Sequence, residues 1–125
     1  MYKILVVDDE PKIREVIKEY GEFSGYEITE ADDGITAVGL CKLNDYDLII
    51  MDIMMPKLDG FSACKEIKKI KDIPVIMLSA RGEEYDKPGV QHLLHLKSKS
   101  KILRPIEIMG FFYEFFCQIQ GNNLL

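Results

Sequence analysis

Residues 47–60 read DLIIMDIMMPKLDG, and this stretch decides the fold. Its first part, residues 48–51, is apolar without polar alternation, which is typical of a strand buried on both faces of a parallel α/β sheet. The run ends in a carboxylate, Asp52, at the end of the strand where open α/β sheets bind their ligands. Pro56 and Gly60 predict a turn before another helix begins.

Two further apolar runs predict strands of the same sheet. Residues 3–7 read KILVV and residues 75–78 read VIML, so both resemble the run before Asp52. Asp8 and Asp9 follow the first of these runs directly. Because a charge at the mouth of a buried strand needs a partner, we expect Asp8 and Asp9 to lie close to Asp52.

Helical patterns fill the segments between these strands. Helices are predicted to begin near Pro11, after the turn that ends at Gly34, and at Gly60. Residues 26–30 alternate between apolar and polar side chains, as in a half-buried edge strand. Strands that alternate with helices imply right-handed βαβ crossovers and a doubly wound parallel sheet with helices on both faces.

Composition favours one cytoplasmic domain. The 125 residues are 47% hydrophobic and 30% charged, and the longest apolar runs are far too short to span a membrane. No secretory signal is expected before the first strand. The formal charge of -5 argues against direct nucleic-acid binding. The three cysteines lack metal-type spacing and His92 and His95 have no third ligand nearby, so no zinc site is expected.

Three strand-end motifs together resemble the receiver domain of two-component response regulators, the CheY-like family. They are residues 4–11 (ILVVDDEP), residues 47–60 and residues 73–81 (IPVIMLSAR), in order and at matching separations. The resemblance covers residues 2–87. It implies a flavodoxin-like, doubly wound parallel sheet of five strands in the order 2-1-3-4-5. It also implies a phosphorelay switch that takes a phosphoryl group from a sensor histidine kinase.

The acids explain how such a switch would work. Asp8, Asp9 and Asp52 at neighbouring strand ends would repel one another unless a hard divalent cation, Mg²⁺ or Mn²⁺, lay between them. By resemblance, Asp9 and Asp52 would bind the ion directly with the backbone carbonyl of Met54, and Asp8 would act through water. Asp52 would be the nucleophile and phosphoacceptor, carrying an acyl phosphate.

The resemblance also implies phosphoryl contacts beyond these acids. The hydroxyl of Ser79 and the backbone of Ala80 follow the third buried strand, and a lysine would come from further along the chain. Counting forward from Ser79 leads to Lys101, whereas counting back from Pro105 leads to Arg104. Lys101 is favoured, because a flexible primary ammonium suits a phosphoryl group and arginine is not an equivalent replacement.

The end of the chain, residues 88–125, departs from the family pattern. It contains no Gly-Ala-Asp-Asp-like turn, no aromatic at the switch position and no Lys-Pro pair. This mismatch indicates either a diverged fifth strand or a reading-frame change after Lys87. Residues 106–119 are apolar nearly all round a helix, which predicts a homodimer or a swapped C-terminal segment that covers them.

Each candidate residue also has a purely structural interpretation. Asp8 and Asp9 could cap the following helix, Asp52 could cap the next loop, and Ser79 could begin another helix. The joint arrangement of the acids at neighbouring strand ends favours a metal and phosphoryl site over these separate roles.

We therefore expect a single receiver domain over residues 1–125, family-like over residues 1–87, with no effector domain. It would be a phosphoryl-accepting switch and not an enzyme. The alternative is a degenerate or truncated receiver that acts only as a protein-interaction module. A metal-dependent phosphohydrolase would need a carboxylate where Met54 stands. A flavin-nucleotide carrier would meet repulsion from the acids that follow the first strand.

Overall fold

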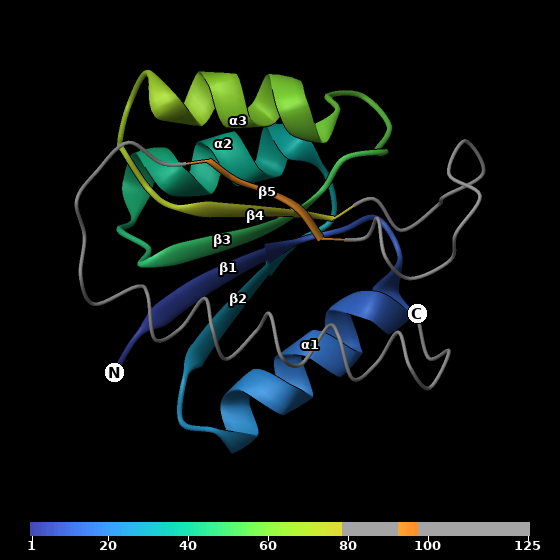
Figure 1. Ribbon diagram of the computed structural model, residues 1–125, viewed down its shortest axis with the longest axis vertical. Coiled ribbons are helices and arrows are strands. Elements are labelled where there is room, and N and C mark those ends of the chain that lie inside the picture. Colours follow the sequence, from blue (N-terminus) through green and yellow to red (C-terminus); the bar gives the residue numbers. More distant parts are fainter. Residues whose placement is uncertain (79–92, 98–125) are drawn as a thin grey trace.

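The computed structural model describes residues 1–78 and the backbone of residues 93–97 (Figure 1). Among these residues are five strands, joined in one sheet in the order β2-β1-β3-β4-β5. The strands are β1 (Lys3–Val7), β2 (Glu27–Ala31), β3 (Leu48–Asp52), β4 (Val75–Leu78) and β5 (Leu93–Lys97). The helices are α1 (Pro11–Phe23), α2 (Gly34–Leu43) and α3 (Gly60–Lys68).

The first four strands of the chain are parallel, as predicted. β1 lies between β2 and β3, with Ile4 opposite Ile28 on one side and Leu48 on the other. β3 pairs with β4, so that Asp52 lies opposite Leu78. For these four strands, the parallel, doubly wound arrangement and the order 2-1-3-4 are therefore confirmed.

The fifth strand corrects one part of the prediction. β5 occupies the expected edge beside β4, but it runs antiparallel, with Val75 opposite Lys97 and Ile76 opposite Leu96. A parallel neighbour requires a crossover that returns the chain to the start of the sheet, whereas an antiparallel neighbour does not. The predicted helix at residues 106–119 lies outside the described residues.

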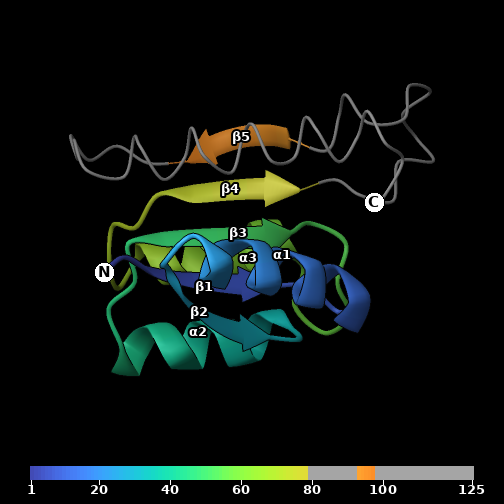
Figure 2. The same ribbon diagram turned by 90° about the horizontal axis from the view of Figure 1, so that it is seen from below.

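The sheet forms a central layer with helices on both faces. Figures 1 and 2 show α1 on one face and α2 with α3 on the other. Each face of the sheet has its own hydrophobic core, and the side chains of β1 point alternately into the two. Leu5 packs in the core beside α2 and α3, and Val6 packs in the core beside α1. Because both faces are covered, β1 is apolar and buried over residues 4–7 and β3 over residues 48–51, which explains the unbroken hydrophobic runs.

Helix ends follow the sequence signals. α1 begins at Pro11, whose fixed backbone suits the first turn and which has no N–H to leave unsatisfied. Asp33 caps α2 by accepting a 2.7 Å hydrogen bond from the Thr36 N–H. Asp59 caps α3 in the same way, accepting from the Ser62 N–H at 2.9 Å. The three helices thus start where the turns between strand and helix were expected.

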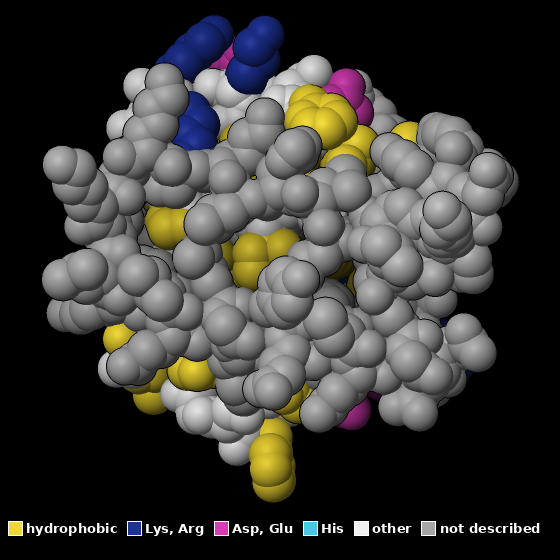
Figure 3. Space-filling view, viewed as in Figure 1, with side chains coloured by type: hydrophobic (Ala, Val, Ile, Leu, Met, Phe, Trp, Pro, Cys, Tyr) yellow, Lys and Arg dark blue, Asp and Glu magenta, His cyan; other side chains and the backbone are white. Residues whose placement is uncertain are grey.

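Cations gather at the far end of α3, away from the carboxyl edge of the sheet (Figure 3). Lys65 and Lys68 belong to the last turn of this helix, where positive charge complements the helix dipole. Lys68 also pairs with Asp72 at 3.1 Å, and Lys69 pairs with Glu66 at 3.2 Å. Lys68 and Lys69 are therefore held in local ion pairs. In the part of the chain that the structure describes, no helix has both the length and the apolar character needed to cross a membrane.

Candidate metal centre

Three carboxylates converge at the carboxyl edge of the sheet. Asp8 and Asp9 follow β1, and Asp52 ends the adjacent strand β3, whose pairing sets Val7 opposite Met51. One oxygen from each of the three acids lies within 4.8 Å of the others. We refer to Asp8, Asp9 and Asp52 as the acid cluster. The sequence predicted this convergence because parallel strands end at the same edge.

Burial and backbone hydrogen bonds orient the acid cluster. Asp8 and Asp52 are fully buried, and Asp9 is partly exposed. The Glu10 N–H donates to Oδ1 of Asp8 at 2.8 Å, and the Met54 N–H donates to Oδ1 of Asp52 at 3.3 Å. The sequence suggested Asp8 and Asp9 as caps of α1, but the N-cap residue is Glu10, whose side chain makes no capping hydrogen bond.

The residues of the acid cluster fit a hard divalent cation. Carboxylate oxygens are the ligands that Mg²⁺ prefers, and oxygens on opposite sides of such an ion are about 4.2 Å apart. The 4.8 Å spread of the cluster is close to that dimension. Two buried carboxylates and a partly exposed third gather negative charge that such an ion would neutralise. The cluster is therefore a candidate magnesium site.

Two glycines at helix starts allow close packing against the loop between β3 and α3. A Cβ on Gly60 would clash with the backbone oxygen of Asp52 and lie 2.8 Å from the Cα of Ile53. The Gly60 N–H also donates to the carbonyl of Ile53 at 2.9 Å. A Cβ on Gly34, at the start of α2, would lie 3.0 Å from the Cβ of Leu58. Only glycine allows these helix starts to approach the loop that follows Asp52.

An ion pair holds the same loop to α2. Lys57 has a left-handed backbone (φ 70°), and its Nζ lies 3.5 Å from Oδ2 of Asp33. The pKa of Asp33 is held below its ordinary value of 3.8, chiefly by hydrogen bonds from Thr36 and further by the charge of Lys57. The sequence indicated a turn at both places but did not indicate that the two residues meet.

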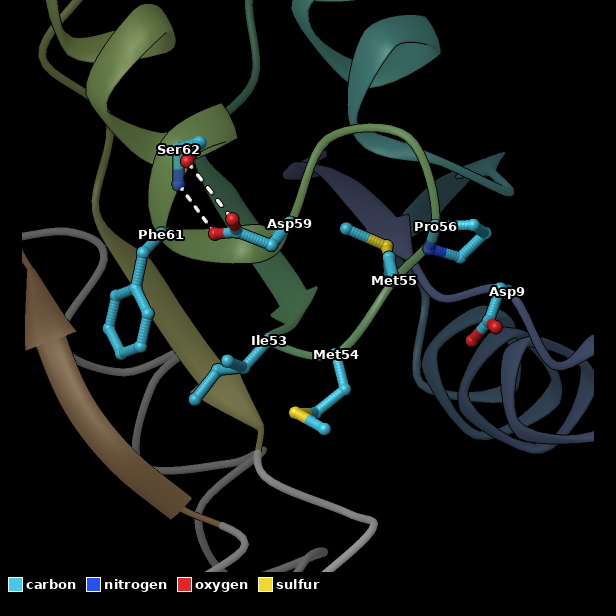
Figure 4. Close-up of a pocket in the computed structure, with 8 residues that line it drawn as sticks. All are labelled: Asp9, Ile53, Met54, Met55, Pro56, Asp59, Phe61 and Ser62. Atoms are coloured by element: carbon cyan, nitrogen blue, oxygen red, sulfur yellow. Dashed lines mark hydrogen bonds between the residues drawn. The ribbon is translucent and has the colours of Figure 1, made fainter.

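A groove of about 750 Å³ runs beside the acid cluster (Figure 4). In this view, Asp9 lies on one side of the groove, Phe61 and Ser62 lie on the other, and Met54 lies between them. Met54 and Phe61 are 44% and 42% exposed, so apolar surface is open next to Asp52. The lining residues are Asp9, Ile53, Met54, Met55, Pro56, Asp59, Phe61 and Ser62.

The other predicted site residues lie outside the described part of the chain. This applies to Ser79, Ala80, Lys101 and Arg104, whose phosphoryl contacts remain predictions. Met54 follows Asp52 closely along the chain, as the prediction of a backbone ligand requires. Sequence reasoning did not single out Arg14, although its guanidinium donates to the Asp8 carbonyl at 2.7 Å.

The fold and the acid cluster together define a class of protein, a flavodoxin-like α/β domain with an acidic cation site at the carboxyl edge of its sheet. The family model for the response regulator receiver domain matches residues 4–107. The chain belongs to this family. The match extends beyond residue 87, where the resemblance of the motifs ended.

Individual relatives agree with this assignment. Over 82 residues the chain is 48% identical to the transcriptional regulatory protein ResD of Bacillus subtilis, a match that covers 66% of this chain and 34% of ResD. The chain thus spans about a third of the length of the curated relatives it matches.

Two solved structures extend the comparison. The response regulator TrrA of Thermotoga maritima, in complex with Mg²⁺ and BeF, has a TM-score of 0.66 and 36% identity, covering 91% of this chain and 98% of TrrA. The receiver domain of a sensor histidine kinase from Pseudomonas aeruginosa has a TM-score of 0.66 and 30% identity. This match covers 92% of this chain and 97% of that domain, which has a magnesium ion in its active site cleft.

Replacing Gly60 with alanine tests the close approach of α3 to Asp52. The added methyl group must displace backbone, so Gly60→Ala is expected to lower the free energy of unfolding by about 1–3 kcal/mol. Gly39→Ala is the matched control, because nothing lies near a Cβ there and alanine favours a helix by about 0.5–1 kcal/mol. Urea unfolding measures both, and a Gly60→Ala variant as stable as the wild type would contradict the packing described.

Substitution of Asp33 separates the helix cap from the ion pair. Asp33→Ala is expected to lower the free energy of unfolding by about 1 kcal/mol at pH 7, whereas Asp33→Asn keeps a good cap and loses only the pairing with Lys57. Because the folded pKa lies below 3.8, the stabilisation by the carboxylate is complete only well above pH 3.8, and it is lost as the pH falls through the folded pKa. The difference in free energy of unfolding between the wild type and Asp33→Ala, measured in urea, should therefore be smaller at pH 3 than at pH 7. If this difference in free energy of unfolding is the same at pH 3 and pH 7, the ionised carboxylate of Asp33 is not the source of the stabilisation.

Proposed function

We propose that the chain is a phosphoacceptor domain in which Asp52 receives a phosphoryl group from a sensor histidine kinase in a two-component phosphorelay. The proposal includes Mg²⁺ or Mn²⁺ as a cofactor, held by the acid cluster with the backbone carbonyl of Met54. The observation that carries it is the convergence of the three carboxylates within 4.8 Å. The Mg²⁺ complexes of TrrA and of the histidine kinase receiver domain support the same cofactor here.

The chemistry of the site follows from its charges. A carboxylate oxygen of Asp52 attacks the phosphorus of a phosphorylated imidazole, so that an O–P bond forms, the P–N bond breaks and the imidazole leaves with the electron pair. A bound divalent cation supplies neutralisation of the negative charge at the phosphoryl group. Asp9 and Asp52 would hold that ion directly and Asp8 would hold it through water, while the Met54 N–H keeps the Asp52 carboxylate oriented.

The family supports the remaining parts of this proposal. Receiver domains pair with sensor histidine kinases, and one structural neighbour is itself the receiver domain of such a kinase. A cytoplasmic location follows from exchange of phosphoryl groups with a kinase that uses cytoplasmic ATP. The domain acts as a switch and not as an enzyme, and it promotes at most its own phosphorylation and dephosphorylation.

A second candidate function is a degenerate receiver that acts only through protein contacts. The observation that favours it is the antiparallel direction of β5, since the family's phosphoryl-binding lysine was expected from a parallel fifth strand. In this alternative, the acid cluster persists but the transfer of a phosphoryl group to Asp52 is lost. Phosphorylation of Asp52 distinguishes the two functions directly.

Labelling with acetyl phosphate tests the proposed function. In the presence of Mg²⁺, the wild type is expected to gain the mass of one phosphoryl group, because the cluster makes Asp52 the reactive carboxylate. Asp52→Asn should remain unlabelled by intact mass spectrometry. Asp59→Asn is the matched control, since Asp59 lines the same groove but caps α3, and it should be labelled like the wild type. Equal labelling of the wild type and Asp52→Asn would contradict the proposal.

Binding of beryllofluoride separates the two candidate functions where labelling is too short-lived to detect. A phosphoacceptor should bind beryllofluoride with Mg²⁺ at Asp52, as a mimic of its phosphorylated form. A wild type that binds Mg²⁺ but neither beryllofluoride nor a phosphoryl group would establish the degenerate alternative.

A further inference from the structure

Arg14, on the first turns of α1, joins β2 to the segment after β1 that carries Asp8 and Asp9. Its Nη1 donates to the backbone carbonyl oxygen of Asp8 at 2.7 Å, and its Nε donates to Oε1 of Glu30 on β2 at 3.0 Å. The Arg14 side chain is only 17% exposed, and Lys18 lies 3.6 Å from the other oxygen of Glu30. The guanidinium is therefore fixed from two sides.

Hydrogen bonds hold the peptide groups on both sides of Asp8, including the one that joins it to Asp9. The Asp8 N–H donates to the Ala31 carbonyl at 3.1 Å, while the Asp8 carbonyl accepts from Arg14. Because a peptide group is planar, the direction of the Asp8 carbonyl sets the position of the Asp9 Cα. Arg14 thus controls where the Asp9 side chain starts, although it is not itself a member of the cluster.

We propose that Arg14 is a positioning residue for the divalent cation: its hydrogen bond to the Asp8 carbonyl sets Asp8 and Asp9 in place before the ion binds. The inference rests on the proposed function, since it assumes that the acid cluster holds Mg²⁺. Groups that orient the ligands of a metal typically change its affinity 10- to 100-fold when they are removed. Arg14 is a residue of this kind, because its hydrogen bond holds the backbone of Asp8.

Charge and positioning predict opposite effects when Arg14 is replaced. A guanidinium near the cluster repels a cation, so its removal alone would tighten Mg²⁺ binding. Loss of the hydrogen bond to Asp8 would weaken Mg²⁺ binding, because the two carboxylates would have to be ordered when the ion arrives. The sign of the change in affinity therefore separates the two effects.

Calorimetric titration of Mg²⁺ into Arg14→Gln tests this inference. The Kd for Mg²⁺ is expected to rise roughly tenfold relative to the wild type. Lys18→Gln is the matched control, because it removes a neighbouring cation that contacts the same Glu30 but not Asp8, and its Kd should stay within about twofold. The midpoint temperature of thermal unfolding is measured for each variant in EDTA. Every Mg²⁺ titration is then made well below that temperature, so that the variant is folded.

A merely structural role would lower the unfolding midpoint of Arg14→Gln without changing its Kd for Mg²⁺, and that result would overturn the inference. Tighter binding would overturn it as well. If Arg14→Gln does not fold, the Kd of Arg14→Lys for Mg²⁺ is measured instead. A lysine carries its charge at one point and cannot contact both Asp8 and Glu30 as the guanidinium does. A Kd at least threefold above that of the wild type would then support the inference, and an unchanged Kd would overturn it. A wild type that binds no Mg²⁺ would overturn the proposed function together with the inference.

Discussion

Repulsion within the acid cluster is the constraint on which the rest of the structure depends. Two unit charges 4.8 Å apart repel by about 3–4 kcal/mol at an effective dielectric constant of about 20, and the cluster brings three carboxylates within that distance. This is a large part of the roughly 5–15 kcal/mol by which a folded domain is stable. The fold must therefore hold the acids together against their repulsion, which a bound cation would relieve.

The two cores and the loop contacts provide that restraint. β1 and β3 are apolar on both faces, so Asp8 and Asp52 leave strands that cannot shift without exposing buried side chains. Gly60 lets α3 approach the backbone of Asp52, and Lys57 ties the same loop to α2 through Asp33. On the other side, Arg14 holds the Asp8 carbonyl. Asp8 and Asp52 are thus held by contacts from the neighbouring helices as well as by the strands β1 and β3.

The sequence predicted the parts of this arrangement that local patterns encode. Apolar runs located β1, β3 and β4, and the common edge of parallel strands predicted that the three acids would meet. The contacts of Arg14 and Lys57 were not predictable, because their partners come close only after the sheet and helices have packed. The direction of β5 was not predictable either, since a short apolar run can pair with a neighbouring strand in both directions.

The most direct test of the central claim is the unfolding midpoint of the wild type as a function of Mg²⁺ concentration. If the acid cluster holds a cation in the folded state alone, the midpoint should rise steadily with the logarithm of the Mg²⁺ concentration above the Kd. Asp9→Asn should lose this dependence and be more stable than the wild type in EDTA, because one repelling charge is gone. A wild-type midpoint that does not respond to Mg²⁺ would contradict the account.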